Sequence, residues 1–173
     1  MKWQTLPLLG VLLSTASIAV TPAQDSADPA GASRNDVGLV DRVENRAEAA
    51  FAERVRQLQS PVYFLDLLRT GPDARLSARL EDGSVVTMGE NAELAIDEFV
   101  YTEGETREIT LRAIKGALLF IGEKLFGGES EVQIRTPVAI LGVRGTEVWV
   151  GPIDGATGVL VIDGEVSVGS AKG

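Results

Sequence analysis

The segment Ile134–Val150, IRTPVAILGVRGTEVWV, decides the fold prediction for this chain. Two runs of strand-forming residues flank Thr136 and Pro137, and a short turn around Arg144 follows them. Proline fixes φ and lacks a backbone donor, so it suits a corner or the first position of a strand. We therefore predict strand, turn and strand here, with a corner at Thr136 and Pro137 that starts the next strand.

Gly142 and Gly145 bracket Arg144, which indicates positive φ or a close approach of the backbone. Two roles are open for Arg144. It could present its guanidinium to a partner's carboxylate or carbonyl groups, or bend inward and tie a corner to Asp82 or Asp97 through its five donors. We favour the inward arginine.

The rest of the chain also shows the two-residue period of apolar and polar side chains that is typical of β-strands. Leu76–Leu80 alternates apolar and polar residues, and Asp82-Gly83 is a hairpin-type turn signal. Short strand-like runs recur about every 8–12 residues, which predicts an all-β fold, either β-solenoid-like or a twisted sandwich. The later Asp163-Gly164 echoes the first pair. That echo indicates either stacked similar rungs or only the common use of Asp-Gly in β turns.

One segment, Asn45–Gln59, has apolar residues at helical spacing, and Ser60-Pro61 would end it. The pattern predicts one N-terminal helix. Its apolar face would hold Ala47, Ala50, Phe51, Val55 and Leu58.

The first 23 residues, Met1–Ala23, have the organisation of a secretory signal peptide: Lys2, an apolar run and small residues at the end. An N-terminal membrane anchor is the alternative. Gln24–Asp36 is small and polar and reads as a flexible lead-in, which leaves residues 37–173 for one β domain. We expect a periplasmic protein without a membrane span after cleavage.

The composition argues against several classes of protein. The net charge is −9, and cleavage would remove Lys2 and no acid, which makes it −10. So acidic a chain is poorly suited to nucleic acid. It has neither histidine nor cysteine, and it shows no nucleophile, phosphate-loop or metal-ligand motif. We predict no enzyme, no cofactor and no metal.

Taken together, these motifs resemble the FecR domain over roughly Val37–Val168. The resemblance implies a periplasmic β-solenoid-like domain that, in the best-known members, belongs to an iron-uptake signalling relay. It also implies strand and extended loop, not helix, over Asn45–Gln59. We expect this chain to stand alone, without the anti-sigma or receptor-contacting segments of those members. The residues that carry the resemblance are Val62, Tyr63, Asp66, Arg69–Gly71, Leu80–Ser84, Ile96–Tyr101, Lys115–Gly122, Arg135–Pro137 and Gly142–Thr146.

The expected function is that of an exported FecR-like interaction module. Its partner would be another envelope protein, such as an outer-membrane receptor or a membrane sensor, bound by surface complementarity or strand addition. The alternative is an envelope scaffold that associates with itself, or a glycan-binding protein, with no signalling role. The candidate structural or interaction residues are Asp82, Gly83, Thr136, Pro137, Gly142, Arg144, Gly145 and Thr146.

Large aromatic residues lie near the strand signals, and they most often fill a core. The alternative is a face that binds sugar or peptide. The residues concerned are Tyr63, Phe64, Phe99, Tyr101 and Trp149.

Overall fold

The computed structural model describes residues 35–102, 106–122 and 129–171, and its regular structure there is entirely β-strand. The predicted all-β class is confirmed. The predicted signal peptide, Met1–Ala23, and most of the predicted lead-in lie outside the described residues. The strands are β1 Asp36–Glu44, β2 Ala47–Phe51, β3 Arg54–Gln57, β4 Val62–Tyr63, β5 Leu67–Thr70, β6 Arg75–Leu80, β7 Val85–Met88, β8 Glu93–Thr102, β9 Thr106–Lys115, β10 Leu118–Ile121, β11 Glu129–Arg135, β12 Ala139–Ile153 and β13 Ala156–Ser170.

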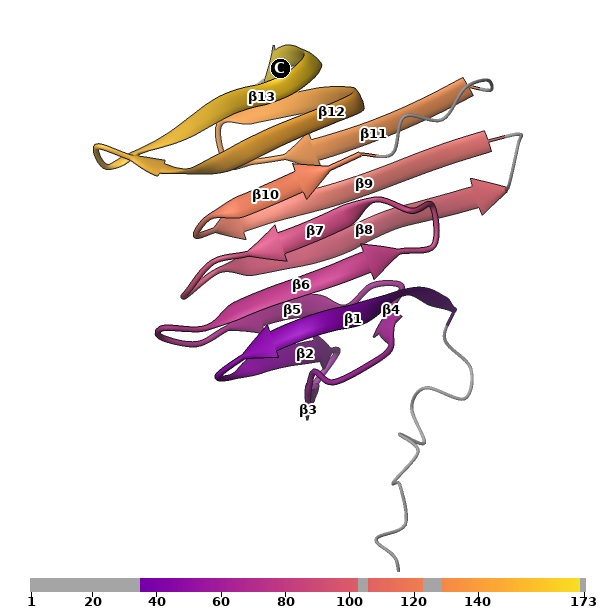
Figure 1. Ribbon diagram of the computed structural model, residues 1–173, viewed down its shortest axis with the longest axis vertical. Coiled ribbons are helices and arrows are strands. Elements are labelled where there is room, and N and C mark those ends of the chain that lie inside the picture. The colour runs from indigo at the N-terminus through magenta and orange to yellow at the C-terminus, as the bar shows by residue number, and fades with distance from the viewer. Residues whose placement is uncertain (1–34, 103–105, 123–128, 172–173) are drawn as a thin grey trace, which may run out of the picture.

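All thirteen strands belong to one curled sheet (Figure 1). Its order is β3-β2-β5-β8-β9-β11-β12-β10-β7-β6-β1-β4, and β13 pairs with β12 outside this path. β12 joins two arms of the sheet: β3-β2-β5-β8-β9-β11 on one side and β10-β7-β6-β1-β4 on the other. It pairs with β11 along its first half and with β10 along its second half. In Figure 1, β7, β6 and β1 lie in front of β8, β5 and β2. The arms thus face each other as in a twisted sandwich, and within the described residues only β9 and β11 pair in parallel.

The core fills the space between the two arms. The alternation predicted in β6 is confirmed, since Leu76, Ala78 and Leu80 are buried while Arg75 and Arg79 are exposed. One continuous apolar cluster includes side chains from both arms and from β12. Burial of each large side chain contributes roughly 1.5–3 kcal/mol to stability. The largest fully buried side chains include Phe120, Leu58, Leu68, Leu76, Met88, Leu94, Ile96, Ile109, Leu111, Ile134 and Leu141.

The predicted helix over Asn45–Gln59 is wrong. This segment forms the antiparallel hairpin of β2 and β3, in which Ala50 lies opposite Val55. The chain reverses at Ala52, whose φ is 52°. A hairpin of this length places apolar residues from both strands at spacings that a helix would also give. The strand and loop implied by the family resemblance is therefore the correct description.

Candidate interaction surface

β12 runs without interruption through the segment expected to turn at Arg144. The register with β13 shifts between Arg144 and Glu147, which identifies a β-bulge. Gly145 has φ 54° and Gly164, on β13, has φ 89°. Both values lie in the region that glycine adopts at little cost. The two glycines therefore absorb the irregularity within the strand pair, and neither Arg144 nor Asp163-Gly164 forms the predicted turn.

Thr146 fastens this bulge. Its side chain is 1% exposed, and its hydroxyl oxygen lies 2.9 Å from the carbonyl oxygens of both Arg144 and Glu165. The backbone amide of Arg144 also donates to this hydroxyl at 3.2 Å. Because buried carbonyl and amide groups are costly to leave unpaired, the hydroxyl stabilises the strand pair where its regular ladder is interrupted.

The side chain of Arg144 is exposed, which corrects the expectation that it bends inward. Asp97 accepts hydrogen bonds from Arg112 at 2.7 and 2.9 Å, and these raise the pKa of Arg112 above its ordinary value. Asp82 is buried and accepts hydrogen bonds from the amide and hydroxyl of Ser84. The structure thus brings neither carboxylate to Arg144 and leaves its guanidinium on the surface.

The Asp82 side chain organises the turn between β6 and β7. The Ser84 amide lies 3.1 Å from Asp82 Oδ1, and the Gly83 amide donates to the Leu80 carbonyl at 3.0 Å. Gly83 has φ 84°. This is the turn chemistry expected from Asp-Gly.

Thr136 and Pro137 lie at the corner between β11 and β12. The Thr136 amide donates to the Ala139 carbonyl at 2.8 Å, and its hydroxyl accepts from the Ala139 amide at 2.9 Å. Further along β12, a Cβ on Gly142 would lie 2.5 Å from Ser167 Oγ, so a side chain there would require the Ser167 hydroxyl to move. These residues form the corner and the close strand approach that their types indicate.

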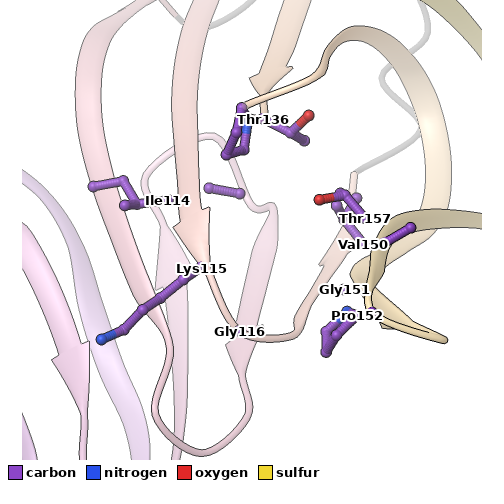
Figure 2. Close-up of a pocket in the computed structure, with 12 residues that line it drawn as sticks. Ile114, Lys115, Gly116, Thr136, Val150, Gly151, Pro152 and Thr157 are labelled. Atoms are coloured by element: carbon purple, nitrogen blue, oxygen red, sulfur yellow. The ribbon is translucent and has the colours of Figure 1, made fainter.

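A shallow hollow of about 220 Å³ lies beside this corner (Figure 2). Its walls come from the β9–β10 turn, the Thr136–Pro137 corner and the tip of the β12–β13 hairpin. The Thr136 hydroxyl is already bonded to Ala139, and Lys115 forms an ion pair with Glu93 at 3.0 Å. The Thr136 hydroxyl and the Lys115 ammonium group at this hollow therefore already have partners within the protein.

β13 presents the most unusual surface of the described chain. It is fifteen residues long, and within the described residues it pairs with β12 alone. In Figure 1 it lies at one end of the molecule and β3 at the other. Most of its side chains are exposed on both faces. The apolar ones that stand out are Leu160 at 56%, Val161 at 43%, Ile162 at 51% and Val168 at 66% exposure.

An apolar row on the outer face leads to this strand. Trp149 of β12 lies opposite Leu119 of β10 on one side and opposite Leu160 of β13 on the other. Leu119 and Trp149 are half-buried, whereas Leu160 is exposed. The row therefore continues to the free edge of the sheet without a charged side chain.

The aromatic residues only partly follow the core prediction. Tyr63 is buried, and Phe64 and Phe99 pack partly buried against the core, but Trp149 lies on the outer face. The side chain of Tyr101 lies outside the described residues. Phe120 is fully buried and was missed, although it lies within the continuous apolar run Leu118–Ile121.

At the other end of the molecule, a buried ion pair joins β3 to the loop before β5. Arg56 Nη2 lies 2.6 Å from Asp66 Oδ2, and the same oxygen accepts the Tyr63 amide at 2.9 Å. The guanidinium also lies over the Tyr63 ring, 4.8 Å from its centroid. This cluster gives a structural role to Asp66, which is one of the residues that carry the family resemblance.

The described residues hold no group of three or more histidine, cysteine, aspartate or glutamate side chains placed to bind a metal ion. They also contain no helix with the length and apolar character required to cross a membrane.

Comparison with known proteins gives one family. The family model described as FecR protein matches residues 66–167, which covers β5 to most of β13 and includes the bulge, the corner and Asp66. No curated protein and no solved structure matches the chain.

Proposed function

Because the chain belongs to the FecR family, a regulatory and signalling family, we propose that it is an exported periplasmic module that binds another protein of the cell envelope. The observation that supports this proposal is the edge of β13. Among the described residues this edge pairs only with β12, and it exposes apolar side chains on both faces. The proposed mode of binding is addition of an extended segment of the partner to β13.

The chemistry of β13 favours strand addition over most other contacts. A free sheet edge presents a row of unpaired amide and carbonyl groups that can pair with another chain. Natural edge strands are usually kept short or protected by charge and proline. β13 is fifteen residues long, has no proline, and carries only Asp163 and Glu165 as charged residues. It therefore suits a partner that supplies both backbone pairing and apolar contacts.

Export is supported by the organisation of Met1–Ala23 and by the family, which is usually periplasmic or membrane-associated. In that compartment the candidate partners are the periplasmic part of an outer-membrane receptor or the outward-facing part of a membrane sensor. The protein's own role would be non-enzymatic.

Site-specific photo-cross-linking in the native cell tests this proposal. A photoreactive amino acid replaces Leu160 on β13 or, as the control, Leu39 on β1, which is equally exposed at 59%. We expect the Leu160 variant to capture one envelope protein that the Leu39 variant does not. Equal capture at both positions, or none at either, would refute it. Retention of the purified chain on cell-wall sacculi would instead favour the glycan-binding alternative.

A further inference from the structure

The outer half of β13 is a short strand segment bounded at both ends. On one side is the tight turn at Asp154 and Gly155, with φ values of 48° and 80°; on the other is the bulge at Gly164. We refer to residues 156–163 between them as the outer segment. Apart from Asp163 at its end, this segment is uncharged. Its pairing with β12 is regular from Ala156 to Val161, and a second register shift falls at Ile162, between Val161 and Asp163.

We propose that a second copy of this chain occupies the outer segment in the free protein, in an antiparallel strand pair centred on Leu160. The reason is that this register is self-complementary. Every apolar side chain meets an apolar residue or a glycine, and the one acid meets a hydroxyl. Within the regular stretch the pairs are Leu160 with Leu160 and Val159 with Val161. Continued through the register shift at Ile162, they are Gly158 with Ile162 and Thr157 with Asp163.

Neighbouring registers are worse. Asp163 is the middle residue of β13, so pairing along the whole strand would place it opposite Asp163 of the second copy. Like charges directly opposite each other destabilise a strand pair. A register centred on Val161 would place Asp163 opposite Val159. The register shifts at Ile162 and around Gly164 also interrupt the ladder, so regular pairing is confined to the part of the outer segment before Ile162.

The outer face of the sheet adds a second reason. Within one copy, Leu119, Trp149 and Leu160 lie on adjacent strands at matching positions. A pair centred on Leu160 joins this row to the same row of the second copy. The apolar row then crosses six strands, and both exposed leucines become covered. Exposed apolar contacts of this kind, flanked by a tryptophan, are typical of the centre of an interface.

The two ends of the strand order, β3 and the two-residue β4, are poorer matches for β13. β3 is only four residues long, and its Arg56 is already engaged with Asp66. Pairing of β3 with β13 of another copy would also be a head-to-tail contact, which extends into open chains unless it closes. A two-fold pair through β13 uses the same surface on both copies and ends at a dimer.

The dimer has a consequence that rests on the proposed function. The self-paired strand and a partner's strand would need the same backbone groups of β13, so the two occupants exclude each other. The partner would then bind the monomer, and its apparent affinity would fall as the chain concentration rises.

A disulfide test reads out the register directly, since the chain has no native cysteine. Opposite Cα atoms in an antiparallel pair are about 4.5 or 5.5 Å apart, within the range that a disulfide spans. We expect mild oxidation of Leu160→Cys to give a covalent dimer. Val168→Cys, at a position that is more exposed than Leu160 (66% against 56%) but beyond the bulge, should remain monomeric. Equal cross-linking of both variants, or none of Leu160→Cys, would overturn the proposed register.

Sedimentation of the purified mature chain tests the dimer without oxidation. We expect a concentration-dependent dimer whose dissociation constant rises at least tenfold in Leu160→Lys, which sets two ammonium groups opposite each other, but not in Val168→Lys. A monomer at every concentration overturns the proposal. If such a monomer still captures an envelope protein through position 160 in cells, the proposed function stands alone. If the chain dimerises but captures no envelope protein through position 160, the dimer stands and the proposed function fails.

Discussion

The hydroxyl oxygen of Thr146 lies 2.9 Å from the carbonyl oxygen of Glu165, across the pair formed by β12 and β13. This contact holds the two longest strands together at the point where their register shifts. It connects the most characteristic motif of the sequence to the strand that forms the free edge of the sheet.

Thr146→Val removes this hydroxyl while it keeps the shape of the side chain. Because the site is 1% exposed, the carbonyls that the hydroxyl faces lose a buried partner, and we expect a loss of about 1–3 kcal/mol in the free energy of unfolding. Urea denaturation measures it. Thr157→Val, at an exposed position on the hairpin tip, is the matched control and should be close to neutral. Equal stability of the two variants would contradict the role of Thr146.

Gly164→Ala tests the close approach at the bulge. A Cβ there would lie 3.0 Å from the Gly145 carbonyl oxygen and the Thr146 Cα, and φ is 89°. Gly155→Ala is the control, since its φ of 80° is similar but its Cβ would meet no atom within 4 Å. Both should lose about 1 kcal/mol or more from φ alone. We expect a further loss, seen as a lower melting temperature, only for Gly164→Ala.

Arg144→Ala and Gly145→Val separate the exposed side chain from the backbone that carries it. The arginine is exposed, so its removal should change the free energy of unfolding by no more than about 0.5 kcal/mol. Gly145 has φ 54°, which a β-branched residue adopts only with strain. Valine there should be clearly destabilising in the same urea series. A large loss in Arg144→Ala would restore the inward role for this side chain.

Arg56→Met leaves the Asp66 carboxylate without its guanidinium partner. Asp66 is 1% exposed and the Arg56 side chain is 19% exposed, so we expect a loss on the order of 3 kcal/mol. Arg46→Met provides the control, because its ion pair with Glu48 is at the surface, where the arginine is 69% exposed. That variant should lose no more than about 1 kcal/mol. Similar losses in both variants, measured by chemical denaturation, would argue against a special role for the buried pair.

The parts of the fold that depend on local chemistry could be predicted from the sequence. Alternation in Leu76–Leu80 identified a strand with one buried face, and Asp82-Gly83 identified a turn. Thr136 and Pro137 identified a corner because proline restricts the backbone wherever it occurs. These signals depend on the preferences of a few neighbouring residues, so they hold whatever the rest of the chain does.

Other features depended on contacts between distant segments. The apolar spacing in Asn45–Gln59 suits both a helix and a hairpin, and only pairing of β2 with β5 decides between them. Likewise, the sequence around Gly145 predicts a turn, whereas the structure shows that Gly145 lies in a strand close to Gly164 of β13. The sequence shows two glycines, whereas the bulge exists only because two strands meet there.

The sequence by itself determined the β class, the family motifs and the acidic, cysteine-free character of the chain. The tertiary structure alone decided that Arg144 faces solvent and that β13, within the part of the chain that the structure describes, pairs on one side only. The physical reason is that strand formation follows a local period of two residues, whereas the position of a strand in the sheet follows from long-range pairing. Leu160 and Leu76 look alike in the sequence, but only Leu76 has the opposite arm of the sheet to cover it.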